Sequence, residues 1–142
     1  ETSIGVDRMF LQVLSAAYYE EELEKDSRVV LKLPPVLAPV KLAVMPLVKK
    51  DGLPEKAREI IDKLKFDFNC SYDEKDSIGK RYRRQDAVGT PFCVTIDHQT
   101  AEDETVTIRY RDSMEQERVK IDDLHGIIAG KVSFKSLFEK LN

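Results

Sequence analysis

Apolar residues recur at helical spacing near the start of the chain. They are Met9, Phe10, Val13, Leu14 and Ala17. The charges of EEELEKD close this pattern, which predicts a helix from near Val6 to about Glu24. The next segment, RVVLKLPPVLAPVK, contains three prolines, which exclude a helix and favour an extended connector. We therefore expect a domain boundary here, with one unit at residues 1–33 and a second at residues 34–142.

Strand and helix patterns alternate in the second unit. The run KLAVMPLV is almost wholly apolar, as in a strand that is covered on both faces of a parallel sheet. Pro54 then opens a helix with one apolar stripe. A second strand is predicted by apolar residues that alternate with polar ones, at Phe66, Phe68, Cys70 and Tyr72. The third strand, FCVTID, follows a helix that begins after Ser77 and ends at Gly89.

The order strand, helix, strand, helix, strand predicts parallel strands joined by right-handed crossovers. TVTIRYR and QERVKI indicate two further strands, joined by the short turn DSME. We therefore predict an α/β fold with a mixed sheet of about five strands, flanked by helices and preceded by the N-terminal helix. A last helix is predicted to begin after the capping residue Ser133. Its expected buried stripe is Phe134, Leu137, Phe138 and Leu141.

Composition narrows the class of protein. The 142 residues are 42% hydrophobic and 35% charged, which suits one domain with a single core. Because the chain has no apolar run of roughly 18 residues and no signal-peptide pattern at its start, we predict a cytoplasmic protein without membrane contact. His98 and His125 lie far apart and lack neighbouring ligands, so no zinc site is expected. Cys70 and Cys93 lie in strand-like runs, where buried reduced thiols are the ordinary interpretation.

One short segment concentrates positive charge in a chain whose formal net charge is -3. SIGKRYRRQD contains Lys80, Arg81, Arg83 and Arg84. On a helix these four cations cover an arc of roughly 160°. A solvated helix face is the ordinary explanation for such a run. The planar arginine fork, however, suits phosphates and base edges, and the helix starts beyond the carboxyl end of a strand, where α/β sheets commonly bind ligands.

Two more arginines fall on one face of a predicted strand. Arg109 and Arg111 alternate with apolar neighbours, so we expect them to extend the basic surface. A local basic face on an acidic chain suits one shaped nucleic acid better than any duplex, because the remaining charge repels phosphate. The residues alone therefore favour RNA binding by these six cations. A small-molecule or redox regulatory α/β domain that uses Cys70 and Cys93 stays open as an alternative.

Several segments resemble a known family. ETSIGVDR resembles the third signature motif of class II aminoacyl-tRNA synthetases in its glycyl form, which reads EPS, any residue, G, any residue, DR. LPPVLAPVKLAVMPLVKK, SIGKRYRRQDAVGTPFCVTID and TVTIRYRDSMEQERV resemble successive parts of the glycyl-tRNA synthetase anticodon-binding domain. The resemblance covers nearly the whole chain. Thr2 departs from it where the family has Pro, and Tyr110 departs where Asp is common.

The resemblance implies a ligase that activates glycine with ATP to glycyl-adenylate and transfers glycine to the 3' end of its tRNA, with magnesium accompanying the ATP. The implied glycine-binding residues are Glu1, Thr2, Ser3, Ile4 and Gly5. The implied ATP-binding residues are Gly5, Val6, Asp7 and Arg8. Glu1 would pair with the glycine ammonium, and Arg8 would stack on adenine or offset phosphate charge. The six cations would meet the anticodon arm of a glycine tRNA, whose anticodon ends in two cytosines.

By the same resemblance, residues 1–33 would be the tail of a catalytic core and residues 34–142 the anticodon-binding domain. Two earlier class II motifs are not found in these residues, so we expect the isolated fragment to be inactive and monomeric. The full-length enzyme would be a homodimer. The start at Glu1, without methionine, fits a piece of a longer protein. A non-catalytic nucleic-acid-binding accessory module of the same fold is the remaining alternative.

Overall fold

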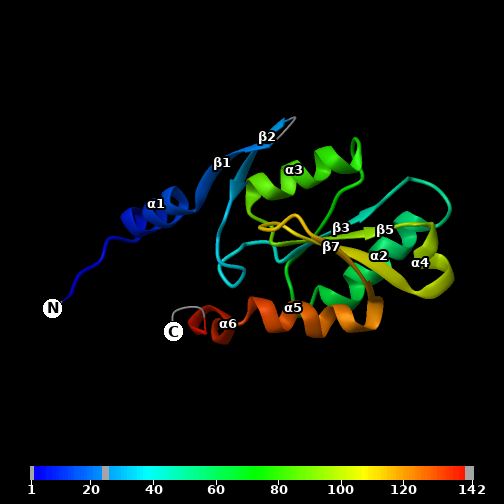
Figure 1. Cartoon of the computed structure of the whole chain (residues 1–142). Coiled ribbons are helices and arrows are strands. Elements are labelled where there is room, and N and C mark those ends of the chain that lie inside the picture. Colours follow the sequence, from blue (N-terminus) through cyan, green and yellow to red (C-terminus); the bar gives the residue numbers. More distant parts are fainter. Residues whose placement is uncertain (1, 24–25, 140–142) are drawn as a thin grey trace.

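The N-terminal part of the chain forms a helix and a β-hairpin. The computed structural model describes residues 2–23 and 26–139, and Figure 1 shows its first helix extending away from the main sheet. The elements are α1 (Val6–Ala17), β1 (Tyr18–Leu23) and β2 (Asp26–Leu31), with β1 and β2 antiparallel. The prediction of a helix to about Glu24 was therefore wrong beyond Ala17, and Glu24 itself lies outside the described residues. Tyr18 and Tyr19 favour a strand because aromatic residues pack well on a pleated surface.

A five-stranded mixed sheet forms the centre of the rest of the chain, as predicted. Its strands are β3 (Leu42–Pro46), β4 (Cys70–Tyr72), β5 (Phe92–Ile96), β6 (Thr105–Tyr110) and β7 (Gln116–Lys120). The order is β4-β3-β5-β6-β7, with β3 parallel to β4 and β5 and the remaining pairs antiparallel. The second strand is shorter than predicted, because Phe66 is 87% exposed and Phe68, although buried, precedes β4.

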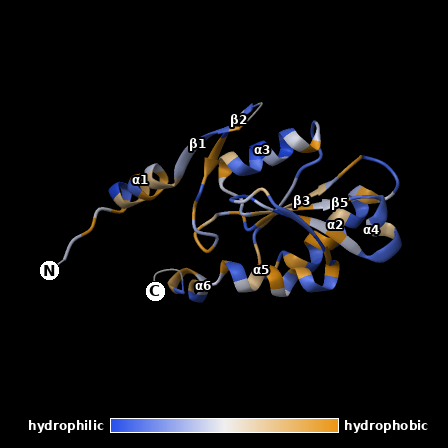
Figure 2. Cartoon of the chain, viewed as in Figure 1, coloured by the Kyte–Doolittle hydropathy of each residue, from blue (hydrophilic) through white to orange (hydrophobic). Residues whose placement is uncertain are grey.

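The two faces of the sheet are covered by different helices. Leu42 and Val44 of β3 point into the main core, together with apolar side chains of α2 (Leu53–Leu64) and α5 (Leu124–Val132). Ala43 and Met45 point the other way, toward α3 (Ile78–Val88). This alternation follows from the two-residue period of a strand. Figure 2 shows mainly hydrophilic residues along α3, in keeping with a helix that buries only a narrow face.

The C-terminal region differs from its prediction. Two helices were not predicted: α5, whose Leu124 and Ile128 are fully buried, and the short helix α4 (His98–Asp103). After α5, Ser133 caps α6 (Phe134–Phe138) as predicted, because its hydroxyl accepts a hydrogen bond from the Ser136 amide. The expected buried stripe of that helix was wrong: Phe134 and Phe138 are exposed, and Leu141 lies outside the described residues. In the described parts of the chain, no helix combines the length and apolarity that crossing a bilayer requires.

A buried ion cluster joins the hairpin to the sheet. Asp86 of α3 is fully buried and accepts two hydrogen bonds from Arg109 of β6, at 2.8 and 3.0 Å. It accepts a third from Arg28 of β2, at 3.0 Å. Arg28 also donates to the carbonyl of Arg111 at 2.8 Å and pairs with Glu21 at 2.6 Å. The cluster therefore connects residues that are 58 and 23 positions from Asp86 in the chain.

Gly89, at the end of α3, allows the hairpin to approach this cluster. Its backbone is left-handed, with φ of 83°, and a side-chain carbon at this position would lie 3.0 Å from the carbonyl oxygen of Leu31. Only glycine adopts this conformation without steric cost. The carbonyl of Gly89 in turn accepts a hydrogen bond from Arg111 at 2.8 Å.

We expect Asp86→Asn to lower the free energy of unfolding by about 3–5 kcal/mol, because the amide leaves the buried Arg109 guanidinium without a negative partner and leaves Arg28 with Glu21 alone. Urea unfolding of the variant and the unchanged chain measures the difference. Asp26→Asn is the matched control, since Asp26 pairs with Arg83 at the surface and should change stability by less than about 1 kcal/mol. Equal stability of Asp86→Asn and the unchanged chain would contradict a structural role for this carboxylate.

Candidate nucleic-acid interface

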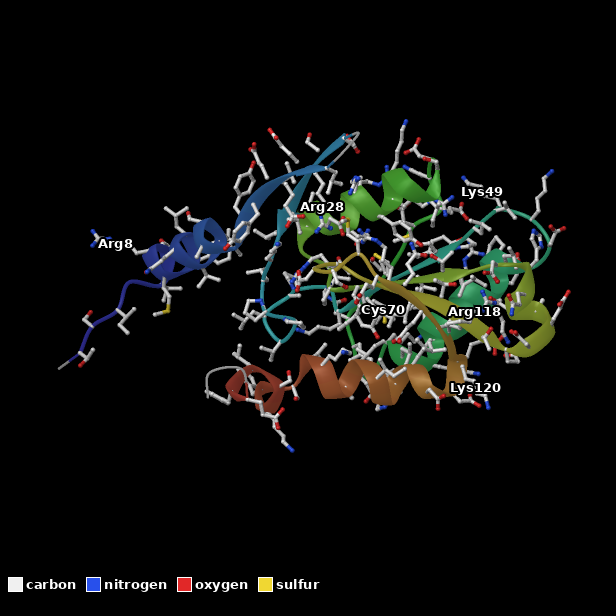
Figure 3. All side chains as sticks on the ribbon, viewed as in Figure 1. Arg8, Arg28, Lys49, Cys70, Arg118 and Lys120 are labelled. Carbon is white, nitrogen blue, oxygen red and sulfur yellow. The ribbon has the colours of Figure 1, made fainter. Side chains whose placement is uncertain are left out.

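The residues expected to bind glycine and ATP lie at the N-terminal end of the structure. Residues 2–5 form an exposed coil that leads into α1, and Glu1 lies outside the described residues. Arg8 is exposed on α1, and Figure 3 shows it well away from the main sheet. The cavity beside this segment, of about 580 Å³, is apolar and includes Ile4, Val6 and Phe10 in its lining. The described part of this segment does not by itself form a polar pocket for a charged substrate.

The predicted basic helix does form, but its four cations differ in environment. Lys80 is exposed and, among the described residues, has no hydrogen-bond or ion-pair partner. Arg83 is half-buried and pairs with Asp26 at 3.3 Å, and Arg84 is engaged by acidic side chains. Arg81 is only 4% exposed, and its guanidinium is directed into the protein. The expectation of one continuous basic face was therefore wrong at Arg81.

The expected extension of this surface by Arg109 and Arg111 was also wrong. Arg109 lies on the predicted face of β6, but α3 covers that face and Asp86 binds its guanidinium. The Arg109 guanidinium also lies 4.8 Å from the ring of Tyr82. Burial alone would lower the pKa of Arg109, but Asp86 raises it above its usual value. Arg111 is 2% exposed and donates to carbonyls of Leu33 and Gly89, each at 2.8 Å.

Other cations take the exposed positions at the edge of the sheet where the parallel strands end. We define the carboxyl edge as residues 47–52 after β3, residues 73–77 after β4, and Lys80 in the first turn of α3. Lys49, Lys50 and Lys75 are exposed there, beside Lys80. Lys49, labelled in Figure 3, pairs with Glu74 at 3.7 Å. Among residues 2–23 and 26–139, the side chains of Lys50, Lys75 and Lys80 form no hydrogen bond or ion pair, although the charge of Lys80, after that of Arg84, helps to lower the pKa of Asp76.

Sequence reasoning missed the lysines of the two loops. The pattern that could have revealed them is their position, because KKDG directly follows a buried parallel strand and open α/β sheets bind ligands at this edge. Exposed ammonium groups bind phosphates as flexible point charges, whereas the buried arginines have already used their fixed donors. The carboxyl edge is therefore the part of the predicted site that can meet an anionic ligand.

Tyr110, which departs from the family pattern, is half-buried and packs against neighbouring side chains. Its ring meets Phe92 edge-on at 5.9 Å, and the Lys131 ammonium lies 5.0 Å from its centre. The Tyr110 hydroxyl donates to Glu117. Burial, followed by this hydrogen bond, raises the pKa of Tyr110 to about 12. Tyr110 therefore fills a structural position between β6, β7 and α5.

The two cysteines do not form a redox pair in this fold. Cys70 and Cys93 lie on the strands that flank β3, opposite Leu42 and Ala43. Two strand spacings separate them by about 9–10 Å, beyond the Cα distance that a disulfide spans. Both thiols are free, and burial raises the pKa of Cys70 to about 11 and that of Cys93 to about 12. The described residues also contain no group of three His, Cys, Asp or Glu side chains that could hold a metal ion.

A family profile described as "Anticodon binding domain" matches residues 41–131, which is more than half of the chain. The chain belongs to the anticodon-binding domain family. Its mixed five-stranded sheet agrees with two solved structures from Cryptosporidium parvum. The RNA binding domain of a threonyl-tRNA synthetase is 26% identical, with a TM-score of 0.64, over 70% of this chain and 25% of that chain. A prolyl-tRNA synthetase shares the fold at 23% identity, with a TM-score of 0.66, over 72% of this chain and 22% of that chain.

The similarity to glycyl-tRNA synthetases is confirmed by curated relatives. A glycine–tRNA ligase of Borreliella burgdorferi is 54% identical over 142 residues, which is 99% of this chain and 32% of that ligase. A glycine–tRNA ligase of Clostridium tetani is 55% identical over 135 residues, or 94% of this chain and 29% of the relative. The chain thus spans about a third of the length of these relatives.

We expect both thiols to resist alkylation in the folded chain. With thiol pKa values of about 11 and 12, roughly one thiol in a thousand or fewer is ionised at pH 8, and only the thiolate reacts. Iodoacetamide labelling followed by mass spectrometry should show slow modification at pH 8, faster modification of the half-buried Cys70 as the pH rises above 10, and rapid modification of both in urea. Rapid labelling of the folded chain at pH 8 would favour the redox alternative.

Proposed function

We propose that this domain recognises the anticodon arm of a glycine tRNA as part of a glycine–tRNA ligase. The observation that carries the proposal is the 54% identity to a glycine–tRNA ligase across 99% of the chain, within the anticodon-binding domain family. The carboxyl edge supports it, because its exposed lysines surround the start of α3. Sequence-specific RNA recognition targets unpaired loop bases, such as the two cytosines that end a glycine anticodon.

On this proposal, residues 1–33 are the tail of the catalytic core and residues 34–142 are the anticodon-binding domain. The complete ligase activates glycine with ATP and magnesium, transfers it to the tRNA 3' end, and works as a cytoplasmic homodimer. The 142 residues by themselves are monomeric and do not catalyse the reaction. Glu1 binds the glycine ammonium with the support of residues 2–5, and residues 5–8, above all Arg8, bind ATP.

We assign different roles to the six cations according to how exposed each side chain is. Lys80 and the exposed edge of Arg83 contact the RNA directly, and Lys50 and Lys75 join them. The buried side chains of Arg81, Arg109 and Arg111 support the surface from within. Arg84 is exposed but bound to carboxylates, and it shapes the loop that precedes α3.

The direct test compares the binding of two RNAs across a salt series: a glycine tRNA transcript and one in which both final anticodon cytosines are replaced. We expect the replacement to weaken binding at least about tenfold, or about 1.4 kcal/mol, because base contacts are lost while phosphate contacts remain. Equal binding of both RNAs with a steep salt dependence would mean that the domain holds phosphates without reading the anticodon.

A second test addresses glycine activation in the complete ligase. Glu1→Gln should reduce kcat/KM for glycine at least about 30-fold in ATP–pyrophosphate exchange, because the substrate ammonium loses a charged partner that is worth 2 kcal/mol or more. Glu59→Gln, on the exposed face of α2, is the control and should leave the rate unchanged. An unchanged rate for Glu1→Gln would contradict the role of the N-terminal loop.

A further inference from the structure

We propose that Arg81 and Arg84 are positioning residues that hold residues 73–77, which we call the clamped loop, in the shape that RNA recognition requires. This inference rests on the proposed function, because it assigns a task to two cations that the sequence analysis placed in direct contact with RNA. Both arginines lie one helical turn apart on α3 and direct their guanidinium groups at the same loop.

Arg81 binds the backbone of the clamped loop from the protein interior. Its Nε donates to the carbonyls of Lys75 and Asp76 at 3.2 and 3.1 Å, and its Nη2 donates to the Asp76 carbonyl at 2.8 Å. Its Nη1 donates to the carbonyl of Pro46, at the end of β3, at 2.6 Å. One buried side chain thus ties the loop after β4 to the end of β3. A lysine keeps the charge at this position but lacks the planar fork that reaches three carbonyls.

Arg84 holds the clamped loop from the solvent side. Its guanidinium donates to Asp73 at 3.1 and 3.3 Å and to Asp76 at 2.8 Å. It also donates to the carbonyl of Lys75 at 2.8 Å. Asp76 needs this support, because its backbone is left-handed, with φ of 64°, a conformation that costs free energy for residues other than glycine.

The same contacts decide the charge that the loop presents to RNA. The clamped loop contains Asp73, Glu74 and Asp76, which repel phosphate when they are unpaired. Arg84 pairs with the two aspartates, and Lys49 pairs with Glu74. The side chain of Lys75 then remains exposed at the carboxyl edge, where phosphates can bind. Loss of the clamp both releases the backbone and uncovers negative charge.

The experiment uses the 142-residue chain and three variants: Arg84→Gln, Arg81→Lys and the control Lys80→Gln. Each binds two anticodon stem-loops, one with the glycine anticodon and one with both cytosines replaced, across a salt series. Arg84 and Lys80 are exposed on one helix, and both substitutions remove one positive charge. Their charge changes are therefore matched, whereas only Arg84 holds the loop.

For the two positioning variants, we expect the affinity ratio between the stem-loops to fall to within about threefold of unity, and Arg81→Lys, which keeps its charge, should leave the salt slope unchanged. Lys80→Gln should keep the ratio and reduce the salt slope by just under 1, as expected for one lost phosphate contact. If Arg84→Gln reduces the slope in the same way and keeps the ratio, Arg84 is a direct phosphate contact and the inference is wrong.

Hydrogen exchange of the free chain tests the clamp without RNA. The Lys75 amide donates to Asp73 at 3.0 Å, and Arg84 fixes that carboxylate. Exchange of the 73–77 segment should become at least tenfold faster in both positioning variants, while exchange in β3 and β5 stays unchanged and so reports an intact fold. Unchanged exchange of this segment would overturn the inference. If the unchanged chain binds both stem-loops equally, the proposed function fails, and exchange alone decides whether the clamp exists.

Discussion

The carboxylate of Asp86 is fully buried where β2, α3 and β6 meet, and it binds the guanidinium groups of Arg28 and Arg109. One negative charge between two buried cations must be fully hydrogen-bonded, since each ion has left water. Glu21 supplies a second carboxylate to Arg28, and the ring of Tyr82 lies beside Arg109. Because an apolar cluster of the same size often gives equal stability, we infer that the main effect of these charges is to fix how the hairpin docks on the sheet domain.

The packing of α3 against this ion cluster explains why a helix rich in arginine exposes few arginines that could contact RNA. The α3 helix faces the ion cluster with Asp86 and the carboxyl edge with its first turn, so its cations are divided between packing and binding. Arginine takes the buried positions, where its planar fork binds several carbonyl or carboxylate oxygens. Lysine takes the exposed positions of the carboxyl edge, where its flexible ammonium can follow a phosphate backbone. The chain is acidic overall, but among the described residues Lys50, Lys75 and Lys80 are exposed at this edge and form no side-chain hydrogen bond or ion pair.

Local sequence patterns predicted most of the helices and strands but not the tertiary contacts that their side chains make. The apolar run at β3 and the proline that opens α2 predicted the parallel part of the sheet correctly. A strand that is buried on both faces consists almost wholly of apolar residues, and this pattern is visible in the sequence. The α5 helix was missed because Gly126 and Gly130 weaken its helical pattern, and the burial of its apolar face stabilises it instead. The alternation in β6 placed Arg109 on the correct face but could not show that α3 covers this face, since that contact depends on distant residues. The same applies to Arg81, whose carbonyl partner at Pro46 is 35 positions away.

On the proposed function, RNA binds at the carboxyl edge because the buried arginines are committed to contacts within the fold. Photochemical cross-linking of a glycine tRNA anticodon stem-loop to the chain, with the attached peptides mapped by mass spectrometry, locates the bound RNA. We expect cross-links within residues 47–52 and 73–84, and their loss when unlabelled stem-loop competes. Cross-links concentrated on the β1–β2 hairpin, or on the opposite end of the sheet around Tyr110 and Lys131, would contradict it.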